Sequence, residues 1–447
     1  VLRRTLASRL SAPEGMNPVE FSSLRAKTLN AMGEYGVTRA LVQDIDTGNY
    51  SNGLTNAAVQ AYIATGDVVG ACPAVRFAES GRDDAQWTML RAICNAYVGE
   101  GALAGRELDR ALSNNIAPQI DVLLAQRFAG AAGRGRRAVS VEWDNVDDLN
   151  PWRFALANAV GEPIPDELLE DAGPYYQRTW ATAPMLPLMQ RARGADRAAR
   201  EGILSSVAMV DLYSQIYADN TLAGAEALTA SRLRQAYVGN SADERMSAMR
   251  DIWGGTANPD YGRYVLTAYA AARLSPDAAF ADDAAPLIAS MLSAGLDRDA
   301  LAWVNVVPAG SQGWAMLQLV RPTADAQLTG EQIEAFLDDD DSAGQRKSQF
   351  FLAGLAGLNR GSSAQLGNAA GDLGVDLSRQ TRWTQLISAA ARVENSALVV
   401  MLAGLGMQGS NWDQMTPLHL FHIVSALNNV GLSAEARLIA AEAVARG

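Results

Sequence analysis

The sequence predicts an all-α fold, an irregular α-solenoid of antiparallel helical hairpins. The first observation is a repeated phrase, Ala-Tyr followed shortly by glycine and an acidic residue, at residues 61–67 and again at residues 96–100. Its tyrosines, Tyr62 and Tyr97, lie 35 residues apart. That spacing is about the length of one helix-turn-helix unit. Such a unit cannot bury its apolar face alone, so it stacks on neighbouring units.

Composition is the second observation that supports this class. The chain has 447 residues, of which 49% are hydrophobic and 19% charged, as in a folded globular protein. Alanine dominates, and alanine favours helices. The chain is too long for one ordinary core, but the core of a solenoid grows in one dimension and escapes that limit.

The net charge of the chain limits the classes of partner that we expect it to bind. The formal net charge is −12, and phosphate binding needs a basic face, so we expect no nucleic-acid partner. No apolar stretch is long enough to span a membrane, and we expect no transmembrane segment. Because the first residue is Val1, we expect a processed or trimmed chain that has lost a signal segment.

Residues 1–130 are predicted to form an N-terminal array of helical hairpins. The clearest helical patterns have connections of a few residues, which make antiparallel neighbours. These helices are expected over residues 54–65, 68–79, 84–99 and 102–114.

The only two cysteines, Cys72 and Cys94, fall in this array. They are nearly equally distant from a turn near Gly81 and Arg82, so an antiparallel hairpin places them level with each other. A disulfide fits that geometry and implies an oxidising compartment, which in a bacterium is the periplasm. The alternative is two buried free thiols, which are common in helical cores.

Residues 131–260 are predicted to form an irregular helical middle. Proline marks the boundaries between short helices, at positions 151, 163, 165, 174, 184 and 187. The phrase of the first array returns as Ala236-Tyr237-Val238-Gly239. A basic stretch at residues 133–137 is either a contact site for an acidic partner or a solvated loop.

Residues 261–447 are predicted to form a C-terminal hairpin array that ends in a terminal cap. Helices over 417–429 and 433–445, joined through Gly431, make that cap. Glycines at 354, 357 and 361 predict close helix packing. The acidic run Asp338–Asp341 is expected to be a solvated turn, because it lacks the ligand spacing of a calcium loop.

Catalytic signals are weak throughout. The only histidines, His419 and His422, are three residues apart among apolar neighbours, and we interpret them as packing or surface residues. No glycine-rich phosphate loop and no zinc-protease motif is present. We therefore predict a protein that is not an enzyme and that has no catalytic residues, cofactor or metal.

Three segments resemble a family of exported, Ala/Leu-rich helical proteins of α-proteobacteria, sometimes labelled as antifreeze-glycopeptide related. They are residues 87–109, residues 150–168 and the closing residues 430–437. We attribute that label to alanine content. The resemblance implies a periplasmic location and a tetratricopeptide-like (TPR-like) helical array, and it supplies no catalytic residues.

Two functions are compatible with these observations. The first is a periplasmic scaffold that binds protein partners in a cell-envelope assembly, which is a flagellar, pilus, secretion or wall-synthesis machine. This function is compatible with higher-order assembly of the protein. The alternative is a helical toroid that acts on glycans or binds a ligand. The sign of such a toroid would be a cleft lined by aromatic side chains. The candidates are Trp143, Trp152, Tyr175, Tyr176 and Trp180. Alternatively, these five residues plug the irregular middle of the array.

Overall fold

The computed structural model describes the chain except for residues 78–80, 133–138, 171, 255–259, 324–327 and 410. Within the described residues the regular structure consists of 26 α-helices and short 3-10 turns, with no strand. None of these helices has both the length and the apolar character that crossing a membrane requires. The predicted all-α fold is confirmed.

The packing divides the chain into two compact units. The N-terminal unit comprises Leu6–Ile203, and the C-terminal unit comprises Leu204–Gly447 together with Val1–Thr5. The three-part division predicted from proline content places boundaries near residues 130 and 260. The boundary between the two units lies inside the predicted middle segment, between Ile203 and Leu204, and the three-part division stays a prediction.

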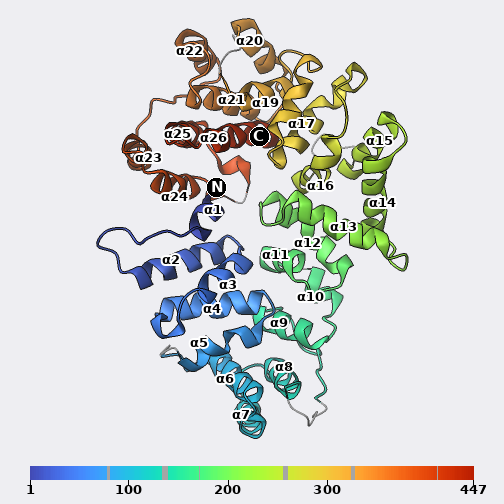
Figure 1. Ribbon diagram of the computed structural model, residues 1–447, viewed down its shortest axis with the longest axis vertical. Helices are drawn as coiled ribbons and strands as arrows, with labels where there is room; N and C mark the ends of the chain where they lie inside the picture. Colours follow the sequence, from blue (N-terminus) through green and yellow to red (C-terminus); the bar gives the residue numbers. More distant parts are fainter. Residues whose placement is uncertain (78–80, 133–138, 171, 255–259, 324–327, 410) are drawn as a thin grey trace. The chain divides into compact units, whose positions relative to one another are not determined.

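The N-terminal unit runs from blue to green in Figure 1. The short helix α1 (Leu2–Ala7) spans the division between the units. The other helices of this unit are α2 (Pro18–Ala31), α3 (Tyr35–Gln43), α4 (Asn52–Ala64), α5 (Cys72–Phe77), α6 (Ala85–Tyr97), α7 (Gly101–Ser113), α8 (Gln119–Gly130), α9 (Pro151–Val160), α10 (Asp166–Glu170), α11 (Pro174–Thr182) and α12 (Leu188–Arg200).

The C-terminal unit continues from green to red. Its helices are α13 (Ser206–Ala218), α14 (Ala225–Val238), α15 (Ala242–Trp253), α16 (Tyr261–Ala271), α17 (Ala284–Ser293), α18 (Asp297–Leu301), α19 (Gln312–Val320), α20 (Gly330–Asp339), α21 (Arg346–Gly357), α22 (Ser363–Asp372), α23 (Arg382–Arg392), α24 (Ser396–Gly406), α25 (Pro417–Asn429) and α26 (Ser433–Arg446).

Within each unit, helices that follow one another in the chain pack together. In the N-terminal unit α2 contacts α3 and α4, α6 contacts α7 and α8, and α11 contacts α12. In the C-terminal unit α13 contacts α14, α14 contacts α15, and α16 contacts α17. Short connections between packed neighbours give the helical hairpins of an α-solenoid, as the sequence predicts.

The repeated phrase is a helix-stop signal. Gly66 and Gly99 follow α4 and α6 with φ of +69° and +95°, a left-handed conformation that glycine adopts without strain. The next N–H then bonds five residues back, Asp67 to Tyr62 O and Glu100 to Asn95 O, both at 2.9 Å. These 6→1 bonds are the mark of a Schellman helix ending.

A third helix ending of this kind precedes the two that the sequence revealed. Gly33, with φ of +78°, ends α2, and the N–H of Glu34 bonds to Leu29 O at 2.9 Å. Glycines 33, 66 and 99 are therefore spaced by 33 residues. The later phrase at Tyr237 is different, because Gly239 has φ of −52° and does not make this ending.

The last hairpin is an inner element of its unit and not an outer cap. Figure 1 shows α26 among α17, α19, α21 and α25, and it contacts all four. Its alanines make that approach close: Ala436, Ala440 and Ala443 are fully buried. The prediction of a hairpin over these residues is confirmed, whereas its role as a terminal cap is corrected by this packing.

The glycines of α21 allow the close packing that the sequence predicts. A Cβ atom on Gly354 would lie 2.8 Å from Leu319 Cδ2 of α19 and 3.0 Å from Ala440 Cβ of α26. One on Gly357 would lie 2.9 Å from Val424 of α25. Gly361 is different, since it has φ of +82° and lies beyond the end of α21.

The acidic run Asp338–Asp341 is only partly the solvated turn that was predicted. Asp340 is half-buried, and its carboxylate accepts bonds from the N–H groups of Ser342 at 2.9 Å and Ser348 at 2.7 Å. These bonds tie the end of α20 to the start of α21. Asp338, Asp339 and Asp341 are exposed, as expected.

Candidate functional site

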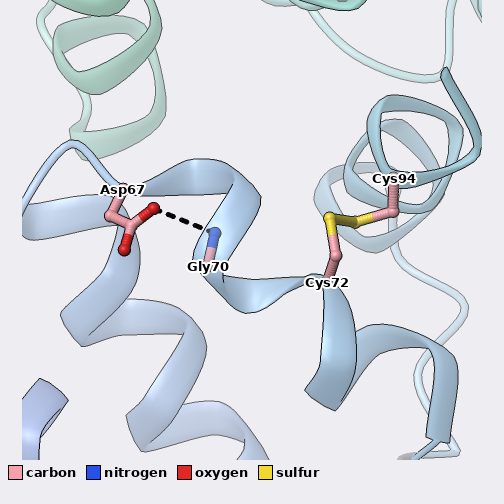
Figure 2. The surroundings of a disulfide bond; sticks show 4 residues. All are labelled: Asp67, Gly70, Cys72 and Cys94. Carbon is pink, nitrogen blue, oxygen red and sulfur yellow. Dashed lines mark hydrogen bonds between the residues drawn. A yellow bond between two sulfur atoms is a disulfide. The ribbon is translucent and has the colours of Figure 1, made fainter. Parts of the chain in front are cut away.

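The two cysteines are joined in a disulfide between α5 and α6. Their Cα atoms are 5.4 Å apart, and Figure 2 shows the bond crossing from the first residue of α5 to α6. Cys94 is fully buried and Cys72 is nearly so. The pairing predicted from the distance of each cysteine to the turn is therefore present.

The acidic residue of the first phrase shapes the chain just before the disulfide. The Asp67 carboxylate accepts a bond from the N–H of Gly70 at 3.0 Å (Figure 2) and starts the 3-10 turn Val68–Ala71. It also forms an ion pair with Arg39 of α3 at 2.8 Å. The turn delivers Cys72 to the face of α6.

The five aromatics of the sequence cluster divide among separate packing environments. Trp152 is 4% exposed in the large apolar cluster that extends from α2 to α9, and Trp143 packs on the same cluster half-buried. Trp180 and Tyr176 belong to a second, smaller cluster around Phe154. Their rings lie 6.4 Å and 5.4 Å from the ring of Phe154.

Tyr175 packs against a different element, helix α3. Its ring meets Tyr35 of α3 at 5.5 Å and Tyr176 at 5.0 Å. Burial raises the pKa of Tyr175, and burial together with the charge of Asp148 raises the pKa of Tyr176 to about 12. The described contacts of the five aromatics are thus packing contacts with apolar clusters and neighbouring rings.

A buried ion pair lies beside Trp152. Arg153 Nε donates to Asp121 Oδ1 at 2.7 Å, and both side chains are at most 7% exposed. Arg153 also bonds to Asp148 at 2.5 Å, and Trp152 Nε1 donates to the backbone oxygen of Asp121 at 3.3 Å. Burial raises the pKa of Asp121, although the bonds from Arg153 oppose that rise.

This pair fixes α8 to α9 and offers no open reacting group. Every polar atom that it presents is engaged by a neighbour, as expected for charges that are buried in pairs. Sequence reasoning missed it because the two residues are 32 positions apart and stand in no motif.

The histidines pack against Trp383 of α23, as expected. The rings of His419 and His422 lie 4.8 Å and 6.4 Å from it. Burial lowers the pKa of His422, and the charge of His419 lowers it further. Among the described residues no group of three or more histidine, cysteine or acidic side chains is arranged to hold a metal.

Two cavities open on the N-terminal unit, and none of the five aromatics lines either one. The first, of about 820 Å³, lies between residues 7–11 and helices α2 and α3. Arg25 lines this cavity and is buried. Its guanidinium donates hydrogen bonds to Leu6 O and to Ser8 O, the latter at 2.6 Å. This cavity is organised around the chain's own backbone.

The second cavity, of about 480 Å³, we name the α10–α12 groove. Its apolar side chains are Ile164, Leu169, Met185, Leu186 and Met189. Its polar side chains are Asn158, Glu162, Asp166, Gln190 and Arg193, and Pro163, Pro187 and Gly161 complete it. The predicted basic contact at residues 133–137 lies outside the described residues, and the structure assigns it no place.

Comparisons with known proteins assign the chain to no family. No protein-family model matches the chain, and no curated protein matches it. Among solved structures it is similar to the crystal structure of the pentatricopeptide repeat protein PPR10 from maize, at 14% identity. The match covers 97% of this chain and 64% of that one, with a TM-score of 0.24. At that score the likeness carries no argument about shape or ligand.

Proposed function

We propose that the chain is a periplasmic helical-repeat scaffold that binds protein partners in a cell-envelope assembly. The observation that carries the proposal is the buried disulfide set within stacked hairpins. Disulfides form and persist in oxidising compartments and are rare in the cytosol, which favours an exported protein. Stacked helical hairpins present extended surfaces to peptides and helices.

The charges and the aromatics support a protein partner over the alternatives. A net charge of −12 disfavours nucleic acid and favours a partner with basic groups. Trp152 and Trp180 are at most 5% exposed, so they offer no stacking platform for a sugar. The glycan-acting toroid therefore receives no support from these two tryptophans.

Cross-linking in intact cells tests this proposal. Intact cells of the source organism are treated with a cross-linker, and the protein is purified and digested without reductant. We expect cross-links to proteins of the cell envelope, together with a disulfide-linked peptide pair that contains Cys72 and Cys94. Recovery of the protein in the cytoplasm with both thiols free, or only as an unpartnered monomer in the envelope, would refute it.

A further inference from the structure

The α10–α12 groove holds apolar groups and unused polar groups together. Met185 is 43% exposed at its edge, next to Leu186, which is only 5% exposed. Methionine side chains are flexible and polarisable, and they adapt to varied apolar partners. The groove therefore has an apolar lining that a ligand can reach.

Three polar side chains of the groove are free. Asp166, Gln190 and Arg193 form no hydrogen bond or ion pair with any described residue. By contrast, Glu162 is engaged by Arg127, and Asn158 donates to Phe154 O at 2.7 Å. The carboxylate of Asp166 comes from α10, whereas the guanidinium of Arg193 comes from α12. An unpaired charge of each sign thus stands on a different helix of one groove.

We propose that this groove docks a short peptide segment of a partner protein, an aliphatic anchor with a basic side chain on one flank and an acidic one on the other. This inference rests on the proposed scaffold function and names the partner's chemistry. The anchor lies against Met185, Leu186 and Met189, the basic group faces Asp166 beside Glu162, and the acidic group faces Arg193.

The size of the groove fits such a segment. A volume of about 480 Å³ lies within the usual range for binding pockets, about 300–1,000 Å³. That volume admits a pair of aliphatic side chains but no folded domain. Because the charges of the groove are of both signs, a purely basic or purely acidic peptide leaves one of them unpaired, which selects for the mixed sequence.

The test is a titration followed by NMR of the methionine methyl groups in the full-length protein. The probes are the acetylated, amidated peptide Lys-Leu-Leu-Glu and its reverse, Glu-Leu-Leu-Lys. The signals of Met185 and Met189 are assigned with Met185→Leu and Met189→Leu. We expect at least one probe to shift both signals saturably, while the other 11 of the 13 methionines serve as internal controls.

Charge variants and altered probes complete the test. Asp166→Asn and Arg193→Gln should each weaken binding roughly two- to fivefold, as expected for one exposed ion pair. The exposed residues Glu167 and Arg298 lie outside the groove, and Glu167→Gln and Arg298→Gln should leave binding unchanged. Replacing both leucines of the probe by glycine should abolish the shifts.

Several outcomes would overturn the inference. One is that the Met185 and Met189 signals do not move with either probe at millimolar concentration. A second is that the charge variants bind the probes as tightly as their controls do. A third is that free leucine produces equal shifts, which would indicate a small-molecule site. Failure of this titration beside positive envelope cross-links refutes the groove assignment alone. Binding in the titration without any envelope partner refutes the scaffold function instead.

Discussion

At the scale of single residues, the Cys72–Cys94 bond is the strongest covalent constraint on the N-terminal unit. It closes a loop across a sequence separation of 22 and ties the short helix α5 to α6. A six-residue helix has little stability of its own, because nucleation of a helix is costly. The cross-link stabilises the folded hairpin that contains α5, because it limits the freedom of the unfolded chain.

Removing this bond should lower the free energy of unfolding by about 3 kcal/mol. The variant Cys72→Ser/Cys94→Ser is compared with the wild-type protein by urea denaturation, each with and without dithiothreitol. We expect reductant to destabilise the wild-type protein to the level of the double variant and to leave the double variant unaffected. A wild-type protein that is insensitive to full reduction would contradict this account.

Asp340 makes stability depend on pH. Burial alone would raise the pKa of its carboxyl group, but the bonds from Ser342 and Ser348 outweigh burial and hold it below its ordinary value of 3.8. The folded state therefore binds the proton less readily than the unfolded state. Its stabilising contribution is complete above pH 3.8 and is lost as the pH falls below that value.

Asp340→Asn should cost about 1–2 kcal/mol at neutral pH, because a charged acceptor is lost at the start of α21. The difference from the wild-type protein should shrink as the pH falls below 3.8, as measured by urea denaturation at each pH. Asp341→Asn, at the exposed neighbouring position, is the control and should show neither effect. A difference that is constant with pH would refute the role assigned to Asp340.

At the scale of helices and turns, the glycine and acidic pair divides the first array into hairpins. Gly99 ends α6 in a left-handed conformation, and Glu100 stands at the N-terminal end of α7. A side chain at Gly99 would meet no neighbour, so only its backbone conformation restricts the position. Gly105 lies inside α7, also without close neighbours, and needs no special conformation.

Two alanine substitutions should therefore have opposite effects. Gly99→Ala should destabilise by about 1–2 kcal/mol, because an L-residue is strained in the left-handed region. Gly105→Ala should stabilise by roughly 0.5–1 kcal/mol, because alanine favours a helix interior. Thermal unfolding followed by circular dichroism measures both. Equal shifts in the same direction would show that Gly99 is not a conformational stop.

At the scale of the whole molecule, the helices of the two units pack in different arrangements. In the N-terminal unit, helices pack on others that are close to them in the chain, and successive helices contribute to the apolar clusters. The C-terminal unit closes on its last helix, since α26 contacts α17, α19, α21 and α25. A helix at the free end of an array would contact only the repeat before it.

The inner position of α26 predicts unequal tolerance along one helix. Ala440 is fully buried against α21, whereas Ala434 is exposed. Ala440→Leu should destabilise by about 1–3 kcal/mol through overpacking, and Ala434→Leu should change stability by less than about 0.5 kcal/mol. Urea denaturation of both variants measures this difference. Equal tolerance would place α26 at an outer edge.

The candidate sites show how far sequence reasoning reached. The disulfide was predictable because both cysteines belong to one hairpin, where distance from the turn sets the register. The five aromatics are close in sequence, yet neighbouring positions on α9 face different clusters: Trp152 packs in the large cluster, while Phe154 anchors the small one. The α10–α12 groove was not predictable, since Asp166 and Arg193 come from helices whose packing no local pattern encodes.

The sequence by itself determined the helical class, the hairpin at Cys72–Cys94 and the helix boundaries at Gly66 and Gly99. Each of these depends on local chemistry: helix propensity, turn conformation and distance along the chain. Only the tertiary structure decided that α26 is an inner helix and that Asp121 meets Arg153. These features depend on which apolar faces bury one another, a choice that involves residues far apart in the chain.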